Sequence, residues 1–348
     1  MHVVILAGGG GTRLWPISQK CFPKQFHAFT DQDSILQKTV QRFISAPFTE
    51  RLVISTNALY APLVKEQIAT DCEVIIEPVS KNTAGGIALA IKYLDLKDTE
   101  EVLIVPADHY IKDVSKLYHA IEQAKVAMQD NKIVVLGVWP DRPETGYGYI
   151  ELGDLLSKHI YHVKTFTEKP DLVMATSFCN TKNYLWNVGI FGFTVKTFWH
   201  ELSLYAPEIV QNFSSSYTKA LADFSSIPSI SIDYALMEKT REAVVVILDT
   251  AWSDIGSWDR VYEIMEKDQN QNVKRGNVVD FETKNSLIFG GKKLISTLGV
   301  EDLLVVETDE AVLIAKKGES EKVRLLLDEF SKSQKKGIKE PIERHHGN

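Results

Sequence analysis

The sequence predicts an α/β protein with a Rossmann-like, open, mixed but mostly parallel sheet that has helices on both faces. Short apolar runs without polar alternation, typical of buried strands, alternate with helical patterns through the first two-thirds of the chain. Near residue 270 the sequence becomes polar and turn-rich, and short β-like pieces and one helix follow. These observations predict one large domain over 1–268 and a small β-rich module with a terminal helix over 277–335.

Each element of the large domain has its own pattern. Buried strands are expected at 3–6, 52–55, 74–76, 102–105, 133–136, 188–193 and 243–248, with a further strand from 160. Helical periodicity predicts helices at 35–44, 62–70, 84–94 and 114–128. In the small module, strands are expected at 286–289, 303–307 and 311–315, and a helix at 320–330 ahead of a charged tail. Ligands of open α/β sheets bind beyond the carboxyl ends of the strands, so the residues that follow each strand are the candidates for function.

Bulk properties narrow the class of protein. The formal net charge of −7 argues against nucleic-acid or anionic-membrane partners. No apolar run approaches the ~20 residues of a membrane-spanning helix, and the first residues lack the basic start of a signal peptide. Three widely spaced cysteines fit neither a disulfide framework nor a zinc site, so we expect a cytoplasmic protein.

The first strand leads into Gly8-Gly9-Gly10-Gly11-Thr12-Arg13, a loop in which backbone N–H groups can approach a phosphate closely. Arg13 stands where both the dinucleotide-binding and the NTPase phosphate-loop patterns require glycine, so the loop belongs to neither class. Arg13 and Lys24 form a candidate polyphosphate clamp. A plain turn and a solvated surface lysine remain the alternatives.

Two carboxylates follow strands. Asp108 comes directly after the strand 102–105, and Asp254 follows the strand 243–248. Magnesium needs only one or two carboxylates, and it prefers oxygen to the nitrogen of His109. Each aspartate is therefore either a magnesium ligand or a cap or turn residue next to a helix.

Four further segments carry polar residues at strand ends or loops. Glu168 and Lys169 offer a hydrogen-bond acceptor and a cation, or form a surface ion pair. Gly146 lies in a glycine-rich segment that either contacts a ligand through its backbone or forms a hairpin turn. Asn187 lies beside an apolar strand, where it is costly to bury unless it is hydrogen bonded. Asp233 is either a ligand-binding residue or a first-turn residue of a helix.

The run 6–18 (LAGGGGTRLWPIS), with Pro23-Lys24-Gln25-Phe26, resembles the N-terminal motif of sugar-nucleotide pyrophosphorylases. Among these nucleotidyltransferases it is most similar to mannose-1-phosphate guanylyltransferases. The segments around Asp108, Glu168 and Asp254 resemble further motifs of the family in the expected order. The resemblance implies transfer of GMP from GTP to mannose 1-phosphate with Mg²⁺, without a covalent enzyme intermediate.

The resemblance also implies residue roles. The triphosphate would be held by Gly8, Gly9, Gly10, Gly11, Thr12 and Arg13, with Lys24 at the α-phosphate, and one magnesium ion would be held by Asp108 and Asp254. The sugar would contact Gly146, Glu168, Asn187 and Asp233, and its phosphate would contact Lys169. The base would lie beside Asn82 and Thr83. The chain has Gly85-Gly86 where the family's Asn-Thr pair is followed by Ala-Pro. The C-terminal module is similar to the family's short β-helix-like extension, which implies a possible homodimer.

Three alternative functions can be compared with this one. The chain could use another hexose or heptose 1-phosphate or another nucleoside triphosphate, because one pocket residue can change either preference. A non-catalytic nucleotide-sugar sensor on the same fold is disfavoured by the joint presence of Arg13, Lys24, Asp108, Lys169 and Asp254. An NAD(P)-dependent dehydrogenase is excluded by the glycine spacing.

Overall fold

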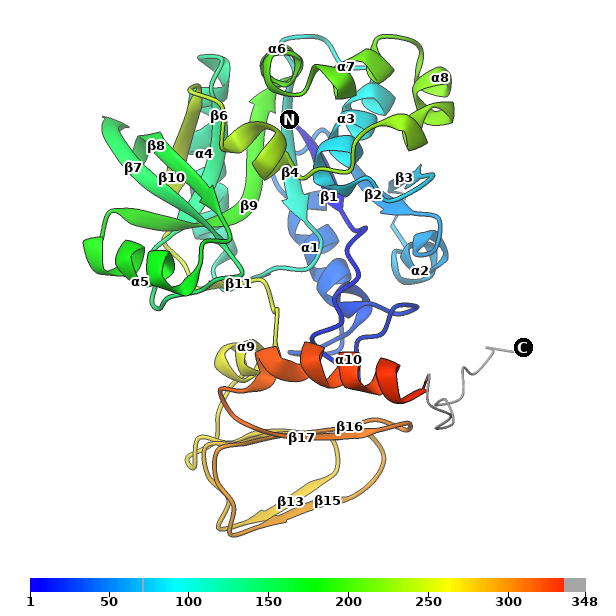
Figure 1. Cartoon of the computed structure of the whole chain (residues 1–348), viewed down its shortest axis with the longest axis vertical. Coiled ribbons are helices and arrows are strands. Elements are labelled where there is room, and N and C mark those ends of the chain that lie inside the picture. Colours follow the sequence, from blue (N-terminus) through cyan, green and yellow to red (C-terminus); the bar gives the residue numbers. More distant parts are fainter. Residues whose placement is uncertain (71, 335–348) are drawn as a thin grey trace. The chain divides into compact units, whose positions relative to one another are not determined.

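The computed structural model describes residues 1–70 and 72–334 (Figure 1). It divides into two units: Met1–Gly9 with Leu36–Trp252, and Gly10–Ile35 with the chain from Ser253 onward. The glycine loop therefore begins in the first unit and ends in the second. The charged tail, and the last residue of the predicted 277–335 module, lie outside the described residues. The predicted boundary between 268 and 277 stays a prediction.

The first unit is built on one mixed sheet with the order β3-β2-β1-β4-β9-β6-β10-β8-β7. Its strands are β1 (His2–Leu6), β2 (Arg51–Asn57), β3 (Glu73–Glu77), β4 (Glu101–Pro106), β6 (Ile133–Val138), β7 (Gly148–Ser157), β8 (Ile160–Glu168), β9 (Tyr184–Thr194) and β10 (Ala243–Ile247). The neighbours β3, β2, β1 and β4 are parallel, as are β6 and β10, whereas β7, β8 and β9 pair antiparallel. The parallel strands bring the ends of β1 and β4 to one edge, where Leu6 lies opposite Pro106. Two short strands complete the unit, β5 (Tyr110–Ile111) and, at its end, β11 (Trp252–Ser253).

Helices cover both faces of this sheet, as predicted. They are α1 (Ile35–Ile44), α2 (Ala61–Gln67), α3 (Asn82–Leu94), α4 (Val114–Gln129), α5 (Leu172–Thr181), α6 (Val195–Tyr205), α7 (Pro207–Phe213) and α8 (Tyr217–Ala222). Alternate strand residues such as Val4, Ile104 and Phe191 form one buried cluster with α3, α6 and α7. Gly192, of opposite parity on β9, faces Met128 of α4 instead. Strands buried on both sides need no polar alternation, which explains the continuous apolar runs.

The second unit is a small, mostly parallel β-structure with two helices. It contains α9 (Trp258–Ile264), β12 (Val273–Arg275), β13 (Val278–Phe281), β14 (Leu287–Phe289), β15 (Ile295–Leu298), β16 (Leu303–Glu307), β17 (Val312–Lys316) and α10 (Val323–Gln334). Strands β12, β14 and β16 pair in parallel on one face, and β13 and β15 pair in parallel on another. Two parallel ladders formed by successive turns of the chain are the β-helix-like arrangement that was expected.

Residues 10–35 belong to this unit because specific contacts hold them there. Arg275 donates to the carbonyl oxygens of Ala28 (2.6 Å) and Phe29 (2.7 Å). The indole Nε1 of Trp258 donates to the carbonyl of Trp15 at 2.9 Å. The loop that carries Arg13 and Lys24 is thus anchored to the β-helix-like module.

Every strand and helix that was expected is present within a few residues of its predicted bounds, and α1 has the predicted bounds. In the first unit the pattern missed β7, the short strands β5 and β11, and the helices α5 to α8; in the second unit it missed β12, β13 and β15. Strand β7 lies in the antiparallel half of the first unit, where the strand–helix alternation breaks down. Among the described residues, no helix is both long and apolar enough to cross a membrane.

Candidate active site

The first two glycines of the loop leave open space beside the end of β1. Two hydrogen bonds hold Ala7, which precedes the loop. Its N–H donates to the carbonyl oxygen of Ser55 at 2.7 Å, and the hydroxyl of Thr56 donates to the carbonyl oxygen of Ala7 at 3.1 Å. A Cβ atom added to Gly8 or Gly9 would meet no atom of the described residues within 4 Å. The chain thus leaves a rigid strand end and exposes backbone to any phosphate that approaches it.

Lys24 joins the rest of the loop to Asp254 within the second unit. A Cβ on Gly11 would lie 3.1 Å from Cγ and Cδ of Lys24, so glycine lets the lysine stem pass close to the backbone. Lys24 is only 9% exposed, and its Nζ donates to the backbone carbonyl of Asp254. The alternative of a solvated surface lysine is therefore wrong.

Arg13 forms an ion pair with Glu321, also in the second unit. Its Nη1 lies 3.0 Å from Oε2 of Glu321, and the two side chains are 42% and 51% exposed. An exposed pair of this kind contributes only about 0–1 kcal/mol. Glu321 therefore holds the guanidinium only weakly.

Asp254 shapes a strained turn ahead of α9. Its Oδ1 accepts the N–H of Gly256 at 3.0 Å, and the buried residue between them, Ile255, has φ of 47°. Left-handed backbone is unfavourable for a β-branched residue and is concentrated at functional sites. Ser257, not Asp254, is the residue that precedes the helix, so Asp254 is a turn residue and not a cap.

Asp108 projects from the end of β4 and is not a helix cap. Helix α4 begins at Val114, and its N-cap is Asp113, whose carboxylate accepts from the N–H groups of Ser115 and Lys116. Asp108 Oδ1 lies 3.6 Å from Nε2 of His109. His109 Nδ1 accepts the indole N–H of Trp252 at 3.2 Å, which leaves the ring proton on the nitrogen that faces Asp108.

The end of β8 carries an acid–base pair. Lys169 Nζ lies 2.6 Å from Oε1 of Glu168, while the buried Oε2 of Glu168 has no hydrogen-bond partner among the described residues. Burial raises the pKa of Glu168, the Asp233 carboxylate adds to this effect, and Lys169 opposes it. Burial lowers the pKa of Lys169, but the hydrogen bond and charge of Glu168 outweigh it, so the net pKa is raised. An unpaired carboxylate oxygen next to an ammonium group can accept a hydroxyl and bind an anion.

Asn187 and Asp233 complete this group from β9 and from the π-helical turn Asp233–Met237. Asn187 Nδ2 donates to Oδ1 of Asp233 at 3.1 Å, and its Oδ1 accepts the N–H of Gly189 at 2.7 Å. Burial raises the pKa of Asp233, against the opposing effects of its hydrogen bonds and of Lys169. Asp233 is a first-turn residue, as one alternative proposed, yet its carboxylate also contacts the predicted sugar-binding asparagine.

The glycine-rich segment leads into β7 and is not a hairpin turn, because the flanking strands β6 and β7 pair with β9 and not with each other. Gly146 donates its N–H to Oε1 of Glu144 at 3.2 Å. Gly148 lies opposite Glu168, and a Cβ there would come within 2.5 Å of Glu168 Oε2. Glycine at 148 thus leaves the space that this carboxylate oxygen occupies.

Asn82 and Thr83 begin α3 beside the end of β3. Asn82 has φ of 63°, and Thr83 Oγ1 accepts the N–H of Ile232 at 2.8 Å. The glycines that depart from the family pattern are packing residues. A Cβ on Gly85 would meet Ile227 at 2.8 Å, and one on Gly86 would meet Oε1 of Glu77 at 2.8 Å.

Two carboxylates near these groups were not predicted. Glu77, the last residue of β3, is buried and accepts from Ser55 Oγ at 3.0 Å, and burial raises its pKa despite that hydrogen bond. Its position after a buried strand is the same signal that identified Asp108. Glu238 accepts the N–H of Glu168 at 2.9 Å, and it is separated from Glu168 by 70 residues, so no local pattern could reveal it.

The structure therefore brings together two groups of predicted residues. Glu168, Lys169, Asn187 and Asp233 meet in the first unit, and Lys24 meets Asp254 in the second. Asp108 belongs to the first unit. The predicted pairing of Asp108 and Asp254 on one ion stays a prediction.

Comparisons with known proteins identify the class. Residues 2–271 match the family model of nucleotidyl transferases, and residues 276–330 match the MannoseP isomerase/GMP-like beta-helix domain. The α/β unit with its strand-end site and the β-helix-like module thus define a nucleotidyltransferase of the kind that makes nucleotide sugars.

Individual relatives narrow the class further. The mannose-1-phosphate guanylyltransferase of Escherichia coli is 37% identical over 97% of this chain and 77% of its own length. The alginate biosynthesis protein AlgA of Pseudomonas syringae pv. tomato is 37% identical over 94% of this chain and 71% of its own length. A crystal structure described as mannose-1-phosphate geranyltransferase from Thermus thermophilus has a TM-score of 0.86 and 29% identity, and covers 95% of this chain and 99% of that one. The chain belongs to the mannose-1-phosphate guanylyltransferase family of enzymes.

Proposed function

We propose that this enzyme transfers GMP from GTP to α-D-mannose 1-phosphate and releases pyrophosphate. The observation that carries the substrate assignment is the group at the ends of β8 and β9, where a carboxylate with an unpaired oxygen adjoins an ammonium group. The name shared by several relatives, mannose-1-phosphate guanylyltransferase, supports the same sugar and base.

The sugar side of the proposal uses four residues. Glu168 Oε2 accepts a sugar hydroxyl, which would satisfy its only unpaired position. Lys169 exchanges part of its contact with Glu168 for the 1-phosphate, and its 56% exposed side chain gives it the freedom to do so. Asn187, held by Asp233 and Gly189, offers its amide to a further hydroxyl, with the backbone at Gly146 alongside.

The triphosphate side uses the glycine loop. Backbone N–H groups from Gly8 to Thr12 cradle the phosphates, and Arg13 leaves Glu321 to bind them. Lys24 is held beside Asp254 and places its charge at the α-phosphate. Asn82 and Thr83, at the start of α3, line the base.

The expected metal is Mg²⁺, and the donor set fits it. Asp108 and Asp254 offer carboxylate oxygens, while the Nδ1 of His109 is occupied by Trp252 and no sulfur ligand lies in either segment. Both aspartates would hold the ion, which when bound neutralises the charge that develops on the phosphates.

The chemistry is an in-line displacement. The sugar 1-phosphate is largely a dianion near neutral pH, because its second pKa is ~6, and so it needs no general base. One of its oxygens forms a bond to the α-phosphorus of GTP while the bond to the β-phosphoryl oxygen breaks, and pyrophosphate leaves with that electron pair. Arg13 and Lys24 reduce the repulsion between the anions and stabilise the leaving group.

The test is pyrophosphate release with Mg²⁺, crossing GTP, ATP, UTP, CTP and dTTP with mannose, glucose and fucose 1-phosphates. A dominant signal for GTP with mannose 1-phosphate is the expected result. A dominant signal for another pair would keep the reaction and reject the substrates. No turnover from folded protein that still binds nucleotide would reject catalysis and favour a nucleotide-sugar sensor.

Assembly and location belong to the same proposal. The face formed by β13 and β15 exposes Val279, Phe281 and Leu298, with Phe281 opposite Leu298 in the ladder. We propose that a homodimer forms through this module, which light scattering of the wild type and of Phe281→Glu would test. A reducing cytoplasmic compartment remains the prediction from the cysteine content.

A further inference from the structure

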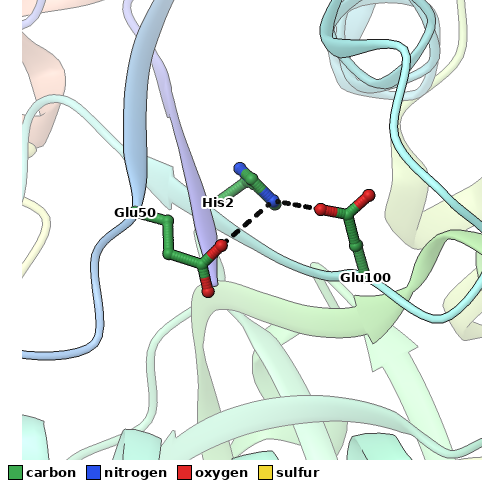
Figure 2. A group of neighbouring side chains, drawn as sticks. All are labelled: His2, Glu50 and Glu100. Carbon is green, nitrogen blue, oxygen red and sulfur yellow. Dashed lines mark hydrogen bonds and ion pairs between the residues drawn. The ribbon is translucent and has the colours of Figure 1, made fainter.

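Three metal-ligating side chains converge where β1, β2 and β4 begin, at the opposite edge of the sheet from the candidate active site. His2 opens β1, Glu50 precedes β2 and Glu100 precedes β4. Figure 2 shows the two carboxylates reaching the imidazole from different sides. One ligand atom from each residue lies within 4.8 Å of the others.

The separations suit a small tetrahedral ion. Nε2 of His2 lies 3.2 Å from Oε1 of Glu100 and 3.7 Å from Oε2 of Glu50. With metal–ligand bonds of about 2.0–2.2 Å, two ligands of tetrahedral zinc stand about 3.3–3.6 Å apart. Only small side-chain movements would be needed to place an ion between the three atoms.

The outer oxygens of both carboxylates are already held. The amino nitrogen of Met1 donates to Oε1 of Glu50 at 2.6 Å, and the N–H of Lys97 donates to Oε2 of Glu100 at 2.6 Å. Outer hydrogen bonds that orient ligating carboxylates are typical of protein metal sites.

His2 is suited to act as a neutral nitrogen ligand. The residue is only 5% exposed, and its Nδ1 is buried without a hydrogen-bond partner among the described residues. The tautomer of a histidine is set by the bond that its other nitrogen makes. Coordination through Nε2 places the single ring proton of the neutral imidazole on Nδ1.

We propose that His2, Glu50 and Glu100 bind a divalent transition-metal ion of the zinc class, with water as the fourth ligand. One imidazole and two carboxylates favour such an ion over Mg²⁺ or Ca²⁺, which prefer oxygen alone. The ion would tie together the starts of three neighbouring parallel strands and so stabilise the first unit. The six residues of β4, about 20 Å of extended chain, separate Glu100 from the segment of Asp108, so the site takes no part in nucleotidyl transfer.

The experiment titrates the full chain with Zn²⁺ against a chromophoric chelator, in excess Mg²⁺ to occupy the candidate active site. Co²⁺ is added in parallel, because a tetrahedral site gives it intense visible absorption. We expect one equivalent of tightly bound Zn²⁺, a tetrahedral Co²⁺ spectrum and a higher unfolding temperature with metal.

Matched variants assign the site. Glu50→Gln and Glu100→Gln should each weaken Zn²⁺ binding by about 100-fold or more, at or beyond the largest loss caused by altering outer ligands. Glu50 is 66% exposed, so Glu50→Gln should fold normally. The control is His200→Gln, which removes a His–Glu pair, with Glu201 at 4.0 Å, and should leave Zn²⁺ affinity within about twofold.

Two results would overturn the proposal. One is a Zn²⁺ affinity that is the same in the wild type as in Glu50→Gln and Glu100→Gln. The other is a Co²⁺ spectrum without tetrahedral absorption. Nucleotidyl transfer should stay unchanged in all three variants, so failure of this proposal is distinguishable from failure of the proposed reaction.

Discussion

Replacing Glu168 with glutamine is the sharpest test of the sugar side. The substitution keeps the volume of a side chain that is only 8% exposed and keeps a hydrogen-bonding oxygen, but it removes the charge that faces both Lys169 and the unpaired position at Oε2. A hydrogen bond to a charged group contributes about 1.5–3 kcal/mol. We therefore expect Glu168→Gln to lower kcat/KM for mannose 1-phosphate by about 10- to 150-fold.

The chain offers a matched control on the same β-hairpin. Glu151 of β7 pairs with Lys164 of β8 at 2.7 Å, much as Glu168 pairs with Lys169 at 2.6 Å. Glu151→Gln removes an ion pair of a kind that contributes little, so it should change kcat/KM by less than about threefold.

The assay is pyrophosphate release at saturating GTP with mannose 1-phosphate varied, and then the reverse. The expected loss falls on the sugar phosphate, and the KM for GTP stays close to that of the wild type. An unchanged kcat/KM for the sugar phosphate, or a loss confined to GTP, would refute the role given to Glu168. If Glu151→Gln lowered kcat/KM for mannose 1-phosphate as much as Glu168→Gln does, the loss would reflect a general destabilisation of the β7–β8 hairpin.

Three further predictions follow from other contacts. Asp108→Asn should lower kcat by at least about 100-fold at saturating Mg²⁺, the usual cost of removing a key electrostatic stabiliser; a near-normal rate would remove Asp108 from the metal site. Glu321→Gln should lower the KM for GTP by at most about fivefold, because the exposed pair with Arg13 is worth no more than about 1 kcal/mol. A raised KM would show that Glu321 assists Arg13 and does not compete for it. Burial raises the pKa of Asp233, so above its ordinary pKa the folded chain binds more protons than the unfolded chain, and the free energy of unfolding falls as pH rises through the raised pKa. Asp233→Asn removes this pH dependence. The free energy of unfolding of the variant minus that of the wild type, measured with urea, should therefore increase from acid to neutral pH. A difference that decreases with pH would contradict the raised pKa of Asp233.

Local sequence pattern was enough for the parallel half of the fold. Buried parallel strands read as continuous apolar runs, and helix α1 follows from periodicity alone, because both depend on residues near in the chain. Candidate residues at strand ends, such as Asp108 and Glu168, could be located for the same reason. The pairing of Asp108 with Asp254 on one metal ion came only from resemblance to a family.

Tertiary structure decided which of these candidates meet. Glu238 holds the N–H of Glu168 from 70 residues away, and Lys24 reaches the carbonyl of Asp254 across 230 residues. It also decided that Lys24 is buried and that Gly148 must lack a side chain next to Glu168. Periodicity reports which face of an element is apolar, but the approach of two polar atoms depends on strand order and loop path, which no local pattern encodes.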